Sequence, residues 1–147
     1  MRTRTLLAPI VVGLLATAAL AAEPKVYFAP QDDFQKALVK EILSAKTSVD
    51  IALYSFQPTS KEKDANYKSL KKRGEITPMD AIREAVKKKV KVRVVLNHAH
   101  IDVNNRRAAT ALIEAGAKVY TVSGTMHSKF AVIDGNRVIN GSGNWSI

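Results

Sequence analysis

Short apolar runs of strand type alternate along this chain with stretches whose apolar residues recur at helical spacing, and this order limits the possible folds more than any other feature. The runs typical of strands lie at residues 25–29, 49–56, 90–97 and 119–122, with a hairpin at 130–140. The stretches typical of helices lie at residues 32–45, at about 78–89 and at 104–115. Strands that alternate with helices predict an α/β fold, here a layered α/β/α sandwich with a mixed, largely parallel sheet.

Residues at the helix ends support this assignment. Asp32 or Asp33 can cap the first helix, because a carboxylate accepts hydrogen bonds from unpaired backbone N–H groups. Thr77-Pro78 marks the start of the second helix, and Gly116 marks the end of the third. Residues 57–77 are polar and lysine-rich, so we expect a mobile insertion there, with a short basic helix as the alternative.

The predicted hairpin carries a strong turn signal. Residues 130–133 form an apolar, partly β-branched run, as a buried strand requires. Asp134-Gly135 then favours a two-residue turn, because glycine accepts the positive φ that such a turn needs. Residues 137–140 carry the chain back beside the first strand of the hairpin.

Four polar side chains flank this hairpin in two pairs of equal spacing. His127 and Lys129 are two residues apart, so on a strand they point to the same side. Ser142 and Asn144 have the same spacing after the return strand. If both pairs lie at the same end of the hairpin, an imidazole, an ammonium, a hydroxyl and an amide converge. Such a set can hold and attack a phosphate.

The spacing His-x-Lys-x4-Asp-x6-Gly-Ser-x-Asn resembles the HKD motif of the phospholipase D superfamily. Its six defining positions are filled by His127, Lys129, Asp134, Gly141, Ser142 and Asn144. Six identities at fixed offsets seldom coincide by chance; the alternative is a hairpin with a polar rim, on which His127 is a surface histidine. The superfamily also often places an aromatic-ended strand, such as 49–56, ahead of the active site.

The resemblance implies a hydrolase, a phosphodiesterase that acts through a phosphohistidine intermediate and needs neither a metal nor another cofactor. His127, Lys129, Ser142 and Asn144 would then be catalytic, while Asp134 and Gly141 would support the hairpin. Members use two motif copies, one histidine as nucleophile and the other as acid, and this chain has one. It therefore resembles the short bacterial members of the exported endonuclease type, which pair as homodimers with a shared active site.

The substrate remains open at this point between nucleic acid, cut by an endonuclease, and phospholipid, cut by phospholipase D activity in lipid degradation. The formal charge is +10, and between residues 61 and 91 eleven Lys and Arg face five Asp and Glu. A run of this kind is either a solvated face or a surface that attracts polyanions.

Residues 1–21 have the pattern of a signal peptide, with Arg2 and Arg4 before an apolar run and Ala19-Leu20-Ala21 at a cleavage site. The apolar run of about 15 residues is short for a membrane anchor, which is the alternative. We therefore expect a periplasmic or secreted protein in which residues 22–147 form a single phospholipase D-like domain. Loss of the leader would lower the charge from +10 to +8.

Two other readings of the sequence stay open. His98, His100 and Asp102 form a His-x-His-x-Asp pattern that resembles a zinc-binding motif of the metallo-β-lactamase fold, although Val103 stands where that motif has another histidine. Family members normally continue beyond the motif, so we expect a domain that is incomplete at its C-terminal end. The second alternative is therefore a non-catalytic, basic polyanion-binding module or an inactive fragment. The absence of cysteine excludes disulfides and thiolate catalysis.

Overall fold

The computed structural model describes residues 23–28, 33–57, 65–97 and 103–145. Five strands form one sheet in the order β3-β2-β1-β4-β5. Their bounds are β1 Ser48–Leu53, β2 Lys91–Asn97, β3 Lys118–Val122, β4 Lys129–Ile133 and β5 Arg137–Asn140. β1, β2 and β3 are parallel, whereas β4 runs antiparallel to both β1 and β5. Four of the five strands thus share one direction, and the predicted mixed, largely parallel sheet is confirmed.

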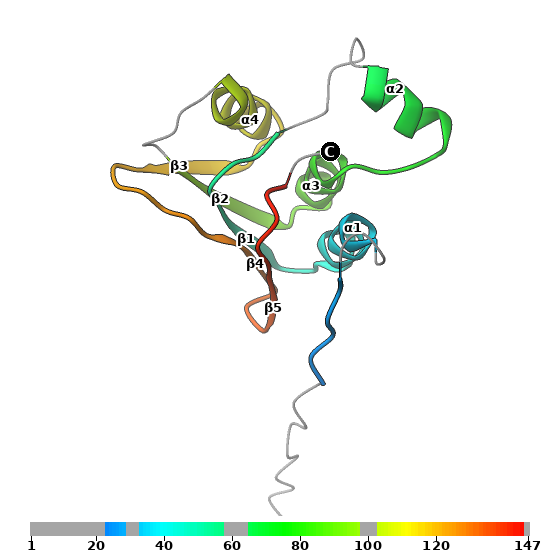
Figure 1. Ribbon diagram of the computed structural model, residues 1–147, viewed down its shortest axis with the longest axis horizontal. Helices are drawn as coiled ribbons and strands as arrows, with labels where there is room; N and C mark the ends of the chain where they lie inside the picture. Colours follow the sequence, from blue (N-terminus) through cyan, green and yellow to red (C-terminus); the bar gives the residue numbers. More distant parts are fainter. Residues whose placement is uncertain (1–22, 29–32, 58–64, 98–102, 146–147) are drawn as a thin grey trace, which may run out of the picture.

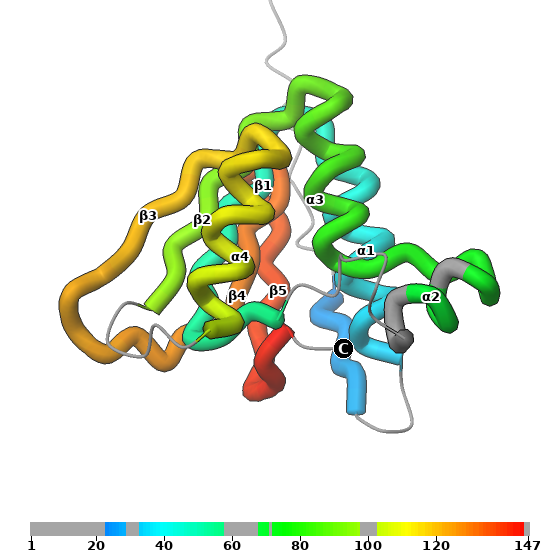
Figure 2. Tube along the Cα trace, turned by 90° about the horizontal axis from the view of Figure 1, so that it is seen from above, coloured from blue at the N-terminus to red at the C-terminus, as the bar shows by residue number. Residues whose placement is uncertain are grey.

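Three of the described helices, α1 Phe34–Ser44, α3 Pro78–Lys87 and α4 Val103–Glu114, cover one face of this sheet (Figures 1 and 2). The fourth of them, α2 Ala65–Lys72, lies away from the sheet. α3 contacts α1 on one side and α4 on the other, and α3 and α4 both contact β2. The layered α/β fold is confirmed, and the described helices supply one of the two helical layers of the expected sandwich.

The core lies between the sheet and these helices, because alternate strand residues point to one face. β1 buries Val49, Ile51 and Leu53, which pair in register with the buried β2 residues Val92, Val94 and Leu96. Burying each such side chain stabilises the folded state by about 1.5–3 kcal/mol. The central strand is therefore fixed in register, and its end at Leu53 sets the position of the residues that follow.

Helix ends form largely as the sequence indicates. Asp33 caps α1, because its carboxylate accepts a hydrogen bond from the Lys36 backbone N–H over 2.9 Å. Thr77 and Asp80 form a capping box at the start of α3, with Pro78 in its first turn. α4 ends before Gly116, whose φ of 92° lies in the left-handed region.

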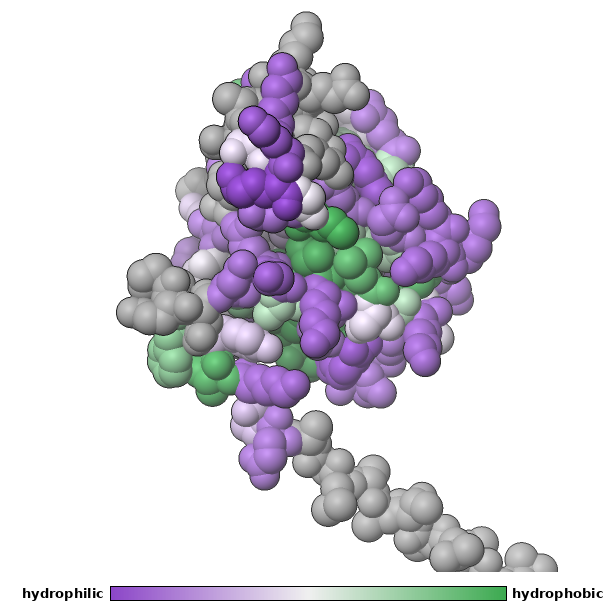
Figure 3. Space-filling view, turned by 90° about the vertical axis from the view of Figure 1, so that its right-hand side faces the viewer, coloured by the Kyte–Doolittle hydropathy of each residue, from purple (hydrophilic) through white to green (hydrophobic). Residues whose placement is uncertain are grey.

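Two local predictions are wrong. Residues 23–28, which include most of the predicted strand 25–29, form no strand, and Val26 and Phe28 are each 67% exposed. A β-branched and aromatic run becomes a strand only where it joins a sheet, and the sheet of the described residues does not include residues 23–28. Tyr27 instead lines an open hollow beside Ala37, Val39 and Leu43 of α1. Figure 3 shows an apolar patch on this side of the molecule, surrounded by hydrophilic residues.

The expected mobile insertion at 57–77 is the second wrong prediction, because α2 forms within it, as the alternative held. The helix ends at Lys72, and the φ of 70° at Gly74 then allows the Glu75 N–H to donate to the Leu70 carbonyl over 2.9 Å. Residues 58–64 lie outside the described residues.

The hairpin turn forms at the predicted Asp134-Gly135, and the Asn136 N–H closes it by donating to the Ile133 carbonyl over 3.2 Å. Strand pairing resumes one residue later, since Ile133 pairs with Arg137. Asp134 and Gly135 both have positive φ, 52° and 73°, as in a type I′ turn.

The predicted leader, 1–21, lies outside the described residues, so the signal peptide and export remain predictions. Within the described ranges, no helix combines the length and the apolar character needed to cross a membrane.

Candidate active site

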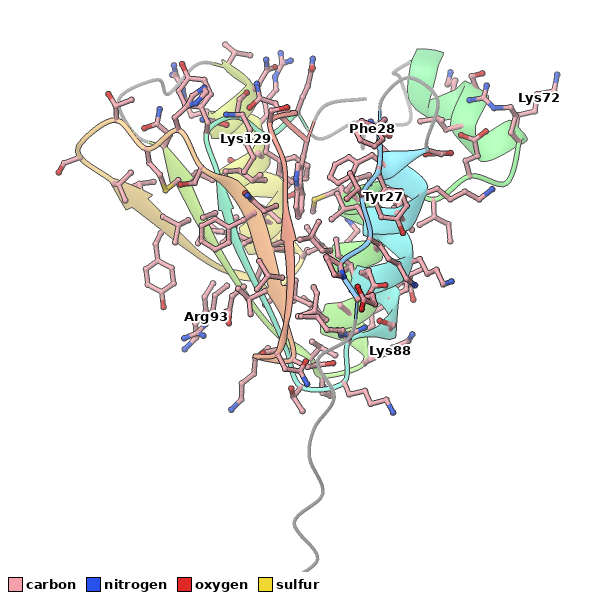
Figure 4. All side chains as sticks on the ribbon, turned by 60° about the horizontal axis from the view of Figure 1, so that its bottom comes forward. Tyr27, Phe28, Lys72, Lys88, Arg93 and Lys129 are labelled. Carbon is pink, nitrogen blue, oxygen red and sulfur yellow. The ribbon has the colours of Figure 1, made fainter. Side chains whose placement is uncertain are left out.

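The candidate site lies at the end of the sheet where β1 stops and β4 begins. Leu53, the last residue of β1, pairs with Lys129, the first residue of β4. Just beyond this pair, the Tyr54 N–H donates to the Ser128 carbonyl over 2.8 Å. Figure 4 shows Lys129 at this end of the sheet and Arg93 toward the other end.

His127 and Lys129 touch, as their spacing predicts. Nζ of Lys129 lies 3.1 Å from Nε2 of His127 and also donates to the His127 carbonyl over 3.1 Å. An ammonium can only donate, so Nε2 is placed to accept from it when the ring proton is on Nδ1.

The Tyr54 ring lies beside both residues of this pair. Its ring meets the His127 ring edge to face, with centroids 4.7 Å apart and planes at 64°. The Lys129 ammonium lies 5.1 Å from the centroid of the same ring, within cation–π range. Lys129 is only 5% exposed, whereas His127 is exposed. The Lys129 side chain is thus buried, while the His127 imidazole faces solvent.

The motif residues after β5 run alongside this pair. The Gly141 N–H donates to the Lys129 carbonyl over 3.2 Å, and the Trp145 carbonyl accepts from the Gln57 N–H over 3.0 Å. Ser142 and Asn144 lie between these two anchors and are exposed. Both motif pairs therefore lie at the open end of the hairpin, as expected. Within the described ranges, no hydrogen bond joins Ser142 or Asn144 to the His127–Lys129 pair.

Asp134 lies at the other end of the hairpin and ties it to the start of β1. Its Oδ1 accepts from the backbone N–H groups of Thr47, Lys46 and Ser48 over 2.7, 2.9 and 3.2 Å. Its Oδ2 accepts from the Arg137 guanidinium over 3.0 Å. Hydrogen bonds from the Thr47 and then the Lys46 backbone hold the pKa of Asp134 well below its ordinary value. These contacts are those of a structural residue.

Sequence reasoning missed two buried amides behind the site. Asn97 ends β2 and is fully buried, and Asn105 in α4 is 2% exposed. Asn105 occupies the same buried stripe of α4 as Ala108 and Leu112. A polar residue on an apolar stripe is a signal in the sequence, because a buried amide must find partners.

The alternative zinc site cannot be placed, since His98, His100 and Asp102 lie outside the described residues. In the parts of the chain that are described, no three His, Asp or Glu side chains are grouped so that they could hold a metal ion.

Comparisons with known proteins converge on one family. Residues 38–147 match a family described as cardiolipin synthase, PLD-like domain. The mitochondrial cardiolipin hydrolase of Danio rerio is 32% identical over 113 residues, which are 75% of this chain and 42% of that protein. The structure of NucT from Helicobacter pylori superposes with a TM-score of 0.54 at 25% identity, over 76% of this chain and 66% of NucT.

The chain thus spans less than half the length of the curated relative that it matches. The matched residues 38–147 include the whole motif, with His127 and Lys129 in contact at the end of the central strands. The chain therefore belongs to the phospholipase D superfamily.

Proposed function

We propose that this protein is a phosphodiesterase in which His127 attacks phosphorus. The contact between His127 and Lys129 carries the proposal. The Lys129 ammonium is buried, and no carboxylate forms an ion pair with it in the described parts of the chain. A buried cation without a counter-ion is costly, and a phosphate anion would neutralise it beside the nucleophile.

Nε2 of His127 would form a bond to phosphorus while the bond from phosphorus to the leaving oxygen breaks. The leaving alkoxide takes a proton from a second, protonated imidazole. Water then attacks the phosphohistidine, its proton returns to that imidazole, and His127 is released. Lys129, with donors from Ser142 and Asn144, would neutralise the anionic oxygens during both steps.

The second imidazole is the reason to propose a homodimer. One histidine cannot act as nucleophile and proton donor in the same step, and the chain has a single motif copy. A two-fold axis brings the same patch of two chains together, so His127 of a second copy can serve as the acid.

Nucleic acid and phospholipid present the same phosphodiester, and an assay with both distinguishes them. Purified protein is incubated in EDTA with plasmid DNA, with cardiolipin vesicles and with phosphatidylcholine vesicles. We expect cleavage of at least one substrate by the wild-type protein and none by folded His127→Ala. Wild-type turnover in folded His127→Ala would refute the nucleophile, and loss in EDTA with rescue by zinc would favour the site at His98, His100 and Asp102.

A non-catalytic polyanion-binding module is the second candidate, favoured by the exposed Lys68, Lys72 and Arg73 of the α2 region. It predicts salt-sensitive DNA binding without turnover of any of the three substrates.

A further inference from the structure

We propose that two buried asparagines, Asn97 and Asn105, position His127 for its reaction. The inference rests on the proposed function, because it names residues that would act through the nucleophile without touching substrate. His127 needs such support, since its side chain is exposed and the core does not fix its orientation.

Asn105 joins α4 to the ends of two strands. Its Oδ1 accepts from the Phe56 N–H over 2.9 Å. Its Nδ2 donates to the Tyr54 carbonyl over 2.9 Å and to the Asn97 carbonyl over 3.4 Å. One side chain therefore holds the backbone on either side of Ser55, just beyond the end of β1.

Tyr54 transmits this restraint to the imidazole. Its N–H donates to Ser128 and its carbonyl accepts from Asn105, so its backbone is held from two sides. Its ring then packs against the His127 ring at 4.7 Å. A displaced Tyr54 would let the imidazole rotate away from Lys129, and the attacking nitrogen would lose its alignment.

Asn97 holds the backbone of the residue that precedes the same histidine. Its Oδ1 accepts from the Met126 N–H over 3.1 Å, directly before His127 in the chain. This donor fixes the orientation of the amide, because Nδ2 cannot accept a hydrogen bond. Nδ2 is buried without a hydrogen-bond partner among the described residues. Burying an unpaired Nδ2 lowers the free energy of unfolding, and an apolar side chain at this position would avoid that cost. The amide is therefore unfavourable for stability, and what it contributes is its hold on the Met126 backbone.

The test uses Asn105→Leu, which keeps the number and branching of the side-chain heavy atoms and removes the polar contacts. Leu112→Ala is the matched control, since Leu112 is fully buried on the same stripe of α4 and does not contact the site residues by any hydrogen bond. The readouts are the NMR resonances of the His127 ring, assigned by their loss in His127→Ala, and kcat and KM for a chromogenic aryl phosphodiester. The chain has three histidines, so the assignment is direct.

We expect Asn105→Leu to move the His127 resonances, because the ring current of Tyr54 changes with its position. We expect kcat to fall about 10- to 100-fold with little change in KM, as for a misplaced reacting group. Tyr54→Leu should move the same resonances, and adding Asn105→Leu to it should add little. Leu112→Ala should lower the thermal midpoint and leave the His127 resonances in place.

Wild-type His127 resonances in folded Asn105→Leu, or equal shifts in Leu112→Ala, would overturn the proposal. Asn105→Gln tests the same link if Asn105→Leu does not fold, since it keeps the amide and lengthens the side chain by one methylene. It should produce a smaller shift, and no shift would overturn the proposal. A wild-type protein that cleaves no phosphodiester would refute the proposed function, while the resonances still decide whether the asparagines position His127.

Discussion

Lys129 brings a positive charge to a place that water hardly reaches. Its stem is buried and its ammonium contacts His127 and lies near the Tyr54 ring. We expect Lys129→Met, which keeps most of the stem, to lower the rate of phosphodiester cleavage about 10²–10³-fold, the usual cost of losing one transition-state contact. The measurement is kcat on the substrate that the wild-type protein cleaves.

Lys118→Met is the matched control for this prediction, because Lys118 is exposed at the start of β3. It removes the same charge from the chain and should leave kcat within about twofold of wild type, as is usual for surface changes. Equal losses in the two variants would mean that Lys129 acts only through the overall charge.

Asp134 makes the stability of the hairpin depend on pH. Its pKa is lower in the folded chain than its ordinary value of 3.8, which the unfolded chain approximates. The carboxylate therefore stabilises the fold above about pH 4, and this contribution is lost as the pH falls below that value. We expect Asp134→Asn to unfold at lower urea concentration than wild type at pH 7, with a gap that narrows below pH 4.

Glu114→Gln is the control for Asp134, since Glu114 is an exposed carboxylate with no hydrogen bond in the described parts of the chain. Its unfolding should occur at nearly the same urea concentration as that of the wild type, both at pH 7 and below pH 4. A gap for Asp134→Asn that stays constant down to pH 2 would contradict the charge as the cause.

At the scale of elements, the end of α4 depends on a glycine for two reasons. Gly116 has a φ of 92°, and a Cβ added there would lie 3.0 Å from Cγ1 of Val86 in α3. We expect Gly116→Ala to lower the free energy of unfolding by about 1–2 kcal/mol because of the backbone conformation. The close contact with Val86 should lower it further. Urea unfolding at neutral pH measures this change.

Gly74 separates the two causes. Its φ is 70°, and a Cβ added there would meet nothing within 4 Å. Gly74→Ala should therefore show the conformational cost alone, and a loss as large as that of Gly116→Ala would contradict the role of the Val86 contact.

Local patterns predicted those elements whose signals are local. Thr77, Pro78 and Asp80 form the start of α3, and alternation in β2 places Val92, Val94 and Leu96 in the core. The run at 25–29 failed because a strand needs a partner, which no local pattern supplies. α2 was misjudged because many charged residues also suit a solvated helix.

The site shows the same division between local and long-range information. Spacing alone predicted that His127 and Lys129 lie together. Their link to Asn105 could not be predicted, because Asn105 reaches Tyr54 across 51 residues of sequence. Only the folded sheet brings β1, β2 and α4 to one end.

For the whole molecule, the homodimer is the prediction with the widest consequence. When wild type is mixed with His127→Ala and subunits exchange, each hybrid holds only one His127 imidazole. Activity should fall roughly as the square of the wild-type fraction if chains pair at random. A strictly linear decline, with sedimentation that shows active monomers, would refute the shared site.

The tie between Asp134 and the start of β1 also orders events in time. Thr47 and Asp134 are 87 residues apart, so β1 leaves the ribosome roughly 4–17 s before its partner β4, at about 5–20 residues per second. During this interval β1 can pair with β2 while its other edge stays open to pairing with foreign strands. Arrival of the hairpin closes that edge and, in the same event, brings Lys129 opposite Leu53. A nascent chain therefore gains its reactive pair in the same step that covers the open edge of β1.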